Sequence, residues 1–570
     1  MKDIVKMKKF RVGFLLDNVY PSFQVNELIE FVDTNNNFDG PVIITGYRDN
    51  ITETIFNKII KIFGLRPSNF VDNIFKVMFN RIINIVELKN TKRRYPKYQA
   101  NYKIKELSKF TVISIEGSWS NSNLYLEMND KDITLIKNLN LDCIVRCGSG
   151  ILRGDILEIP KLGVISFHHG DNRNNRGGPS GFWEVLNREP SSGFIIQKLN
   201  NELDGGEVLF RGNLMTNNLW LANNAQLMIK SNIYMINILQ EIAQTKSLPK
   251  SEGVRLHGNM LFRTPSSLTL LKYLMSVVAP KIFHSLLSKL VKPKMIKWSI
   301  AYCYHNDFKK SLWRYKEIIN PKDRFLADPF VIEHLSENFI FVEDLFYKDN
   351  KGRISVIRVN RENYDFLGVV LEEDFHLSFP FVFKDGEDIY MIPESSENFD
   401  IRLYKCIDFP FKWKLEKQLM TAVDAADTML IKNNNRWFML TNICGAGIGD
   451  HQSELHIFYA DDFKENKWMP IESGNPVIFD PLQGRNGGLF KHNGILYRVN
   501  QIHGQDHFGK NFGINEVVTI SKEKYEEKRV SIIEPNFKNS AISTHHYSAN
   551  AKIAVVDFAR LERVRTAQNN

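Results

Sequence analysis

Cysteine is scarce in this chain, which has 5 cysteines among 570 residues and no C-x-x-C pair. An odd, scattered set does not indicate a disulfide framework, and we therefore also expect no zinc or other metal site. No apolar run approaches the ~20 residues that a membrane-spanning helix needs. The first lysines lead into a short apolar strand without a small-residue cleavage site, so we expect no signal peptide and a cytoplasmic protein.

Glycine is missing from the turn after the first predicted strand. Residues 10–16 form a short apolar run suited to a buried strand, and residues 17–22 read DNVYPS. A dinucleotide or phosphate loop would need glycines there, so that backbone N–H groups can approach phosphate. The net charge of +9 is spread over a long chain and does not by itself imply nucleic acid. We expect neither a phosphate loop nor a nucleic-acid partner.

What the first half does contain is an alternation of short apolar runs with helical segments. That alternation is typical of an α/β domain with a Rossmann-like parallel sheet, which we place over residues 1–250. A long helix at 219–243 closes it, and 58–88 is predicted to be largely helical before a basic loop at 89–97. The predicted strands are 10–16, 41–45, 111–116, 141–146 and 163–167.

A helical linker is predicted over 251–297. Its second helix starts at Pro280 and has an apolar face opposite a face rich in lysine. Two interpretations stay open: a linker helix packed on a neighbouring domain, or a basic amphipathic segment at 281–297 in peripheral contact with anionic lipid.

The last half carries an internal repeat. Asp328, Phe379, Asp427 and Asn486 each begin a similar five-residue motif, at spacings of 51, 48 and 59 residues. Each motif is followed by a polar turn and an aromatic strand, a period in the range of a four-stranded propeller blade. A fifth element at the C-terminal end completes the set. We therefore predict an all-β, five-bladed β-propeller over 298–570.

The segment 163–207 concentrates residues suited to proton chemistry. His168 ends a predicted strand, and Asp204 follows after one helix and one further strand. In a parallel sheet, that connection would place Asp204 at the same edge as His168. A nearby carboxylate orients an imidazole and raises its pKa, which suits proton transfer near neutral pH. A histidine at a strand end is also a common hydrogen-bonded structural residue.

The run 141–209 resembles the folate-dependent formyltransferases, a family that includes methionyl-tRNA, glycinamide ribonucleotide and sugar N-formyltransferases. The resemblance implies 10-formyltetrahydrofolate as the formyl donor and a primary amine as the acceptor. The motifs that carry it, in order, are CGSGILRGDILEIPKLG at 147–163, Ser166-Phe-His168, RGGP at 176–179, WEVLN at 183–187 and ELDGG at 202–206.

The resemblance also implies roles for individual residues. His168 would stabilise the developing oxyanion or transfer a proton, and Asp204 would orient it. The backbone of Gly150, Ile151 and Leu152 would hold the pterin ring.

Ser166 stands where the family has an asparagine that donates to the formyl oxygen. A serine hydroxyl can also donate, but losing such a donor outright typically lowers the rate by ~10²–10³. Either activity persists with altered geometry or the chemistry has changed. His169, beside the motif, is expected to face the other side and serve structure.

The last half is similar to propellers of the family-43 glycoside hydrolase type, and closer to the propeller domain of plant glucosamine inositolphosphorylceramide transferases. Asp328 matches the general-base position and Asp427 the carboxylate that tunes pKa values. Asn486 occupies the position of the acid and cannot donate a proton to a leaving group, so we do not expect hydrolysis of that type. We expect carbohydrate binding near the propeller axis by Asp328, Glu394, Asp427, Arg485, Asn486 and His546.

Together these features predict a formyltransferase acting on an amino sugar, with the propeller holding the glycan, glycolipid or sugar nucleotide. The alternatives are a glycan-binding protein with a degenerate formyltransferase domain and a propeller that itself transfers glycosyl groups.

Overall fold

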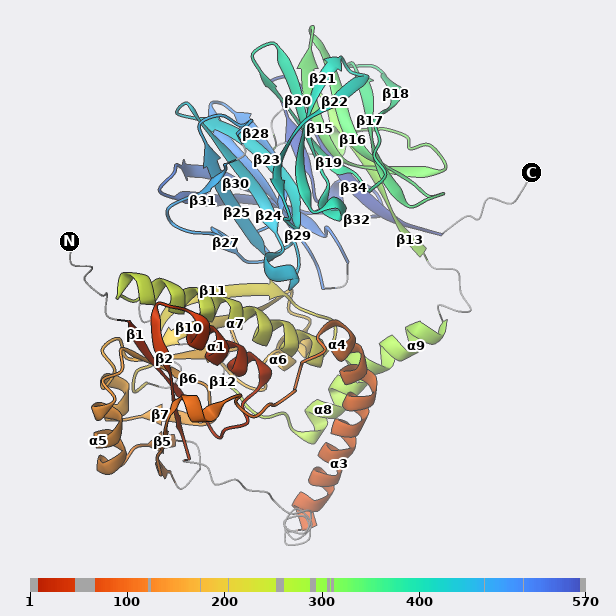
Figure 1. Ribbon diagram of the computed structural model, residues 1–570. Helices are drawn as coiled ribbons and strands as arrows, with labels where there is room; N and C mark the ends of the chain where they lie inside the picture. Colours follow the sequence, from red (N-terminus) through yellow and green to blue (C-terminus); the bar gives the residue numbers. More distant parts are fainter. Residues whose placement is uncertain are drawn as a thin grey trace, which may run out of the picture. The chain divides into compact units, whose positions relative to one another are not determined.

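The computed structural model divides into two compact units, Met1–Ile282 and Phe283–Asn570, here called the N-terminal and C-terminal units (Figure 1). Each is described by itself. The described residues are 9–46, 67–120, 125–174, 176–202, 205–252, 261–287, 294–304, 308, 312–465, 467–505 and 507–563.

The N-terminal unit is built on a seven-stranded sheet in the order β11-β10-β8-β6-β1-β2-β3. Five strands, from β3 to β8, run parallel, whereas β10 is antiparallel to both of its neighbours. The predicted parallel sheet is therefore confirmed only in part: the sheet is mixed. The strands are β1 (Phe10–Leu15), β2 (Phe38–Thr45), β3 (Thr111–Ser114), β6 (Cys143–Arg146), β8 (Val164–His168), β10 (Ser191–Lys198) and β11 (Glu207–Met215).

The central strands are buried on both faces, as an apolar run without polar alternation requires. Val12 and Phe14 of β1 are fully buried. α1 (Phe23–Thr34) and α7 (Trp220–Thr245) contact each other and pack against β2 and β10. α5 (Asp130–Asn138) contributes Ile133 and Ile136 to a core cluster with residues of β1, β2 and β6. These helices pack on the sheet and thereby fix the positions of its strand ends.

Two helical segments pack against the start of α7. The first is α3 (Pro67–Ile83), which continues through η1 (Asn84–Leu88) into α4 (Lys89–Arg94). The second is α8 (Ser267–Tyr273), which continues through η4 (Leu274–Val278) into α9 (Ala279–Leu287). The basic stretch predicted as a loop is thus helical over α4, because the helix runs on through η1. Residues 58–66 of the predicted helix lie outside the described residues.

Glu87 joins these segments to α7. Its buried carboxylate accepts hydrogen bonds from the Tyr273 hydroxyl (2.7 Å) and from the backbone N–H of Leu221 (2.9 Å) in the first turn of α7. Burial raises the pKa of Glu87, although the bonds to Leu221 and Tyr273 and the charge of Lys281 oppose the rise. One carboxylate therefore positions three helical segments.

In the described part of the chain, no helix combines the length and the apolar character needed to cross a bilayer. Residues 294–297, predicted as the end of a basic linker, begin strand β13 instead. Residues 288–293 of that linker lie outside the described residues.

The C-terminal unit consists of five antiparallel sheets. Neighbouring sheets contact one another in a circular order, through β15, β19, β23, β28 and β33, and β33 contacts β15 again. β13 and β34 pair over their whole lengths, so the two ends of the unit share one sheet. The arrangement is propeller-like, in agreement with the predicted repeat.

The five sheets have the following strands: β13 (Lys294–Cys303), β14 (Lys316–Glu317), β32 (Ala541–Ser543), β33 (Tyr547–Ala549) and β34 (Ala554–Arg563); β15 (Arg324–His334), β16 (Glu337–Phe346), β17 (Lys351–Val359) and β18 (Tyr364–Leu371); β19 (Ser378–Asp385), β20 (Asp388–Glu394), β21 (Asp400–Asp408) and β22 (Lys412–Thr421); β23 (Ala425–Asn433), β24 (Arg436–Ile443), β25 (Glu454–Ala460), β26 (Met469–Pro470) and β27 (Ile478–Phe479); β28 (Asn486–His492), β29 (Ile495–Ile502), β30 (Asn511–Ile520) and β31 (Tyr525–Ile533).

The repeated motifs mark an irregularity in the first strand of four sheets. The pairing register shifts at each motif, which is the signature of a β-bulge. Asp328, Phe379 and Asp427 have φ values of 48°, 44° and 50°, a region that non-glycine residues rarely adopt. Such strain persists where the surrounding structure over-determines it, often at functional sites.

Candidate functional site

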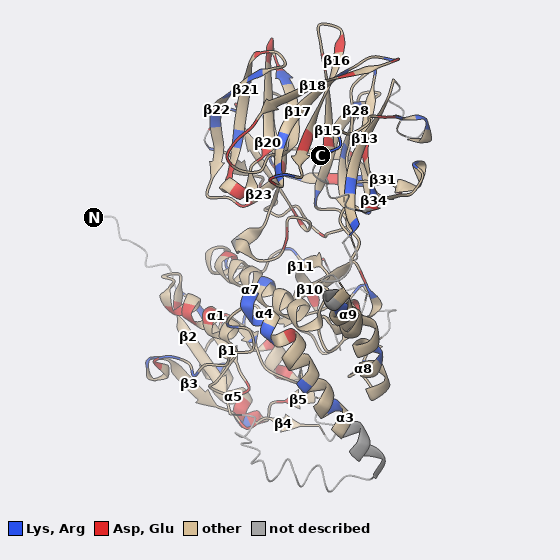
Figure 2. Cartoon of the chain, turned by 90° about the vertical axis from the view of Figure 1, so that its right-hand side faces the viewer, with Lys and Arg blue, Asp and Glu red and all other residues tan. Residues whose placement is uncertain are grey.

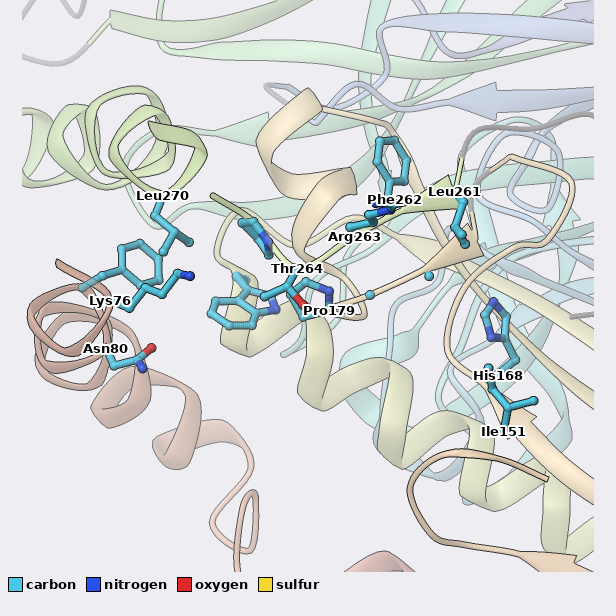
Figure 3. Close-up of a pocket in the computed structure, with 15 residues that line it drawn as sticks. Lys76, Asn80, Ile151, His168, Pro179, Leu261, Phe262, Arg263, Thr264 and Leu270 are labelled. Carbon is cyan, nitrogen blue, oxygen red and sulfur yellow. The ribbon is translucent and has the colours of Figure 1, made fainter. Parts of the chain in front are cut away.

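His168, at the carboxyl end of β8, lies at one end of a cavity of about 960 Å³ (Figure 3). Ile151 of β7 (Ile151–Arg153) lies beside it. The wall continues along the 177–179 loop and Trp220 to Lys76 and Leu270 at the far end, with Arg263 and Thr264 between. Most of this wall is apolar or aromatic. The cavity is thus long and suits a flat, largely apolar molecule with its reactive end at His168.

Ser166 and His169 lie on a second, smaller cavity of about 290 Å³, with Arg146 and Ser231. The Ser166 hydroxyl lies 3.3 Å from the backbone carbonyls of Arg146 and Phe167 and shares its one hydrogen between them. Ser166 and His168, predicted to act together, line different cavities.

His169 serves as a fixed, neutral ring. Its Nε2 lies 3.0 Å from the Ser231 hydroxyl of α7, and its ring stacks on Phe167. Burial, together with the smaller effect of the neighbouring His168, lowers the pKa of His169 to about 4. A neutral imidazole tied to α7 agrees with the structural role expected for this residue.

The segment predicted to hold the pterin ring contributes one residue to the large cavity. Ile151 lines it, whereas Leu152 is buried in the core and Gly150 occupies a turn with φ 79°. The preceding loop is held by Asp17, whose carboxylate accepts from the backbone N–H (2.9 Å) and the hydroxyl (2.8 Å) of Ser149. Asp17 was not predicted as a site residue. The sequence feature that points to it is its position in the glycine-free turn after the first strand.

Asp204 lies outside the described residues, so its distance to His168 stays open. The argument that a parallel strand brings it to the edge of His168 is wrong. β10 is antiparallel to β8, so Lys198 pairs with Ile165, and the backbone N–H of Leu199 donates to Val164 (2.8 Å). The chain therefore leaves β10 at the opposite end of β8. The turn that follows is tied to β7 instead, because Asn201 accepts from the backbone N–H of Gly154 (3.0 Å).

In the C-terminal unit, Asp427, Glu394 and Arg485 form a buried charge cluster. Arg485 donates to both carboxylate oxygens of Asp427 (2.6 and 3.3 Å) and lies 3.6 Å from Glu394. Burial raises the pKa of Asp427 well above its usual value, Arg485 opposes this, and Glu394 adds to it. Burial also acts to raise the pKa of Glu394, but Arg485 together with Asp427, His451 and Ser396 outweighs burial, and the pKa falls. The pKa values of the two carboxyls are therefore shifted in opposite directions.

A second chain of polar groups, Asp557–His545–Asp328, lies near this cluster. His545 Nδ1 is 2.5 Å from Asp557, and its Nε2 is 3.6 Å from Asp328. The ring also stacks on Trp298 with centroids 4.0 Å apart. The ligand-type atoms of these three residues lie within 4.8 Å of one another. Asp557 and His545 therefore form a close, buried ion pair, and Asp328 lies on the other side of the same ring.

Asn486 and His546, predicted to bind carbohydrate, are both completely buried. Asn486 donates to the backbone carbonyl of Asp427 (2.8 Å), and its side-chain oxygen accepts from Arg498 (3.2 Å). The ring of His546 packs against Phe330 with centroids 4.5 Å apart. Both residues are placed to hold the cluster, whereas Arg485 and Glu394 are partly exposed.

We expect Asp328→Asn to change the pH dependence of stability. Burial acts to raise the pKa of Asp328, His545 acts to lower it and Glu343 to raise it, and the net effect raises the pKa to about 7. Because the folded pKa lies above the unfolded value of ~3.9, the neutral form stabilises the fold fully below about pH 4, and this contribution is lost as pH rises from about 4 through about 7. The variant should gain stability relative to the unchanged chain between about pH 4 and pH 7, with a constant difference above about pH 7, measured by denaturant unfolding. A pH-independent difference would contradict this assignment.

Comparison with known proteins yields a match for each half. Residues 316–557 match the family profile described as "Glucosamine inositolphosphorylceramide transferase 1, N-terminal". The chain is 32% identical over 254 residues to glucosamine inositolphosphorylceramide transferase 1 of Arabidopsis thaliana, covering 42% of this chain and 32% of that protein. It is 24% identical over 241 residues to methionyl-tRNA formyltransferase of Clostridium beijerinckii, covering 41% of this chain and 74% of that protein.

Among solved structures, a thermostable family-43 glycoside hydrolase covers 43% of this chain and 90% of its own at 14% identity, with a TM-score of 0.32. The chain spans about a third of the length of the curated plant relatives it matches. Both resemblances identified in the sequence are thus confirmed. The chain combines similarity to formyltransferases with similarity to the N-terminal domain of glucosamine inositolphosphorylceramide transferases.

Proposed function

We propose that this chain is an N-formyltransferase that moves a formyl group from 10-formyltetrahydrofolate to the amine of an amino sugar. The observation that carries the proposal is His168 at one end of a long, mostly apolar cavity, beside Ile151. An imidazole there can accept the proton that the attacking amine loses. The apolar and aromatic wall fits a flat donor.

In this proposal the donor supplies the formyl group, and the protein supplies position and proton transfer. The amine forms a bond to the formyl carbon, the bond from that carbon to the donor nitrogen breaks, and His168 carries a proton between the two nitrogens. The proposed role of Asp204 in orienting His168 now rests on the resemblance to the formyltransferases and not on the strand order. The similarity to methionyl-tRNA formyltransferase supports the donor class, and Ser166 is left as a second candidate donor to the oxyanion.

The C-terminal unit would bind the carbohydrate as a five-bladed, glycosidase-like propeller. The partly exposed Arg485 and Glu394 offer a cation and a carboxylate for sugar hydroxyls. Because the plant relatives are named inositolphosphorylceramide transferases, a lipid-linked acceptor belongs among the candidates with free and nucleotide-linked sugars. We also propose that the protein is cytoplasmic.

The test is incubation of the full chain with 10-formyltetrahydrofolate and a panel of free, nucleotide-linked and lipid-linked amino sugars. We expect tetrahydrofolate release that depends on one acceptor class, and a gain in acceptor mass of one formyl group. Release without any acceptor product, or no release with any acceptor, would contradict formyl transfer.

A glycan-binding or glycosyl-transferring protein with a degenerate formyltransferase domain is the second candidate. It is favoured by Ser166, whose hydroxyl donates to backbone carbonyls and lines a different cavity from His168. Calorimetry with a folate analogue separates the candidates. Micromolar folate binding supports the first, and glycan binding without folate binding supports the second.

A further inference from the structure

The exposed apolar side chains of the N-terminal unit are concentrated on its two helical segments. Of the 14 large apolar side chains exposed in its described residues, 9 lie there. We call these nine the helical-pair surface. They are Ile74, Val77, Met78, Ile82 and Ile85 on α3 and η1, and Leu268, Leu271, Met275 and Ile282 on α8, η4 and α9.

Helix α3 carries apolar residues on its exposed face as well as on its buried face. Phe79 and Ile83 are 2% exposed and pack inward, Phe79 against the ring of Tyr273. Met78 and Ile82, one position earlier in each case, are 56% and 37% exposed. A surface helix normally carries polar residues on its outer face. An outer face built from isoleucine, valine and methionine indicates a second, apolar partner.

The same segments carry a one-sided charge. Residues 74–97 contain seven lysines and arginines and a single acid, Glu87, which is buried; residues 261–287 contain three basic residues and no acid. Figure 2 shows the basic residues gathered at α4, directly after the apolar stripe of α3 and η1. The exposed members of α4 are Lys89, Lys92, Arg93 and Arg94.

We propose that the helical-pair surface docks on an anionic lipid surface. Apolar side chains enter the boundary between headgroups and acyl chains, while lysine and arginine pair with anionic headgroups. The charge argues against a second copy of this chain as the occupant. A two-fold contact would place the same basic patch against itself, and like charges would repel.

The helical-pair surface differs from the lipid contact at residues 281–297 that the sequence left open. Lys294 and Lys297 of that segment lie in strand β13. Ile282 belongs to the helical-pair surface itself, and Lys281 precedes it in α9. The proposal does not depend on the formyl-transfer activity.

The test is co-flotation of the full chain with phosphatidylcholine vesicles and with vesicles that also contain phosphatidylglycerol, at about 0.15 M salt. We expect at least about tenfold tighter binding to the anionic vesicles, weakened by added salt. Met78→Asp with Met275→Asp should lower that binding at least about tenfold, because two charges would have to enter the interface.

The matched control is Val518→Asp with Ile532→Asp, which changes two side chains of similar exposure (58% and 54%) on the C-terminal unit. This variant should bind vesicles like the unchanged chain. Thermal melts check that both variants fold, which we expect because all four positions are exposed. Equal binding to both vesicle types, an undiminished Met78/Met275 variant, or a dimer that the same two substitutions abolish would each overturn the proposal.

Discussion

His168→Ala is expected to lower kcat/KM for formyl transfer by about 10²–10⁴, the usual contribution of a positioned general acid or base. His168 is the imidazole that lines the large cavity, at the end of β8 and beside Ile151. The measurement is the steady-state rate of tetrahydrofolate release with the amino sugar that the acceptor panel identifies. The loss should fall mainly on kcat, because the apolar walls that bind the donor are unchanged.

His169→Gln is the matched control, since it changes the next residue of the same strand end. Its side chain can still bond to Ser231, and it lies on the other cavity. We expect kcat/KM within a few-fold of the unchanged chain. If both variants lose activity equally, the assignment of the proton-transfer role to His168 fails.

Arg485→Met is expected to lower the free energy of unfolding of the C-terminal unit by about 3–5 kcal/mol. Asp427 is 2% exposed and accepts two hydrogen bonds from Arg485, and Glu394 lies 3.6 Å from the same guanidinium. Removing the cation leaves these carboxyls buried together without their counter-charge. Denaturant unfolding, followed for the C-terminal transition, measures the loss.

Arg436→Met provides the contrast. Arg436 pairs with Asp461 at 3.0 Å, but Asp461 is 78% exposed, so the pair is solvent-screened and its loss should cost at most about 1 kcal/mol. Adding Asp427→Asn to Arg485→Met should recover part of the stability, because one buried carboxyl is then removed and asparagine tolerates the φ of 50° at this position. Equal losses in the free energy of unfolding for Arg485→Met and Arg436→Met would contradict the stronger effect expected for the buried pair.

The propeller-like unit could be predicted from its sequence because the four motifs mark the same irregular position in successive sheets. The bulge and positive φ at Asp328, Phe379 and Asp427 restrict which residues fit, and this restriction makes the repeat recognisable. The charge cluster could be predicted in part from the sequence, because Asp427 begins one of the four motifs and Arg485 directly precedes another. His545 and Asp557 were not predicted as a pair, because their contact depends on how the segment between β32 and β33 folds back onto β34.

The direction of β10 could not be predicted from its composition. An apolar run such as Phe194–Gln197 reads the same whichever way the strand points. The connection from β8 to β10, residues 169–190, is long enough for a parallel crossover, so its length did not indicate the direction of β10 either. The cavity that Ser166 lines could likewise not be predicted from its motif. The loops around β8 enclose two cavities, and their arrangement decides which residue lines which cavity.

The two helical segments have one further consequence, because they form both a cavity wall and an outer surface. Phe79 and Leu270 line the large cavity, while their sequence neighbours Met78 and Leu271 are exposed. A ligand in the cavity and a surface bound outside therefore act on opposite sides of the same helices. Thermodynamic linkage makes any such effect reciprocal: the factor by which lipid changes donor affinity equals the factor by which the donor changes lipid affinity.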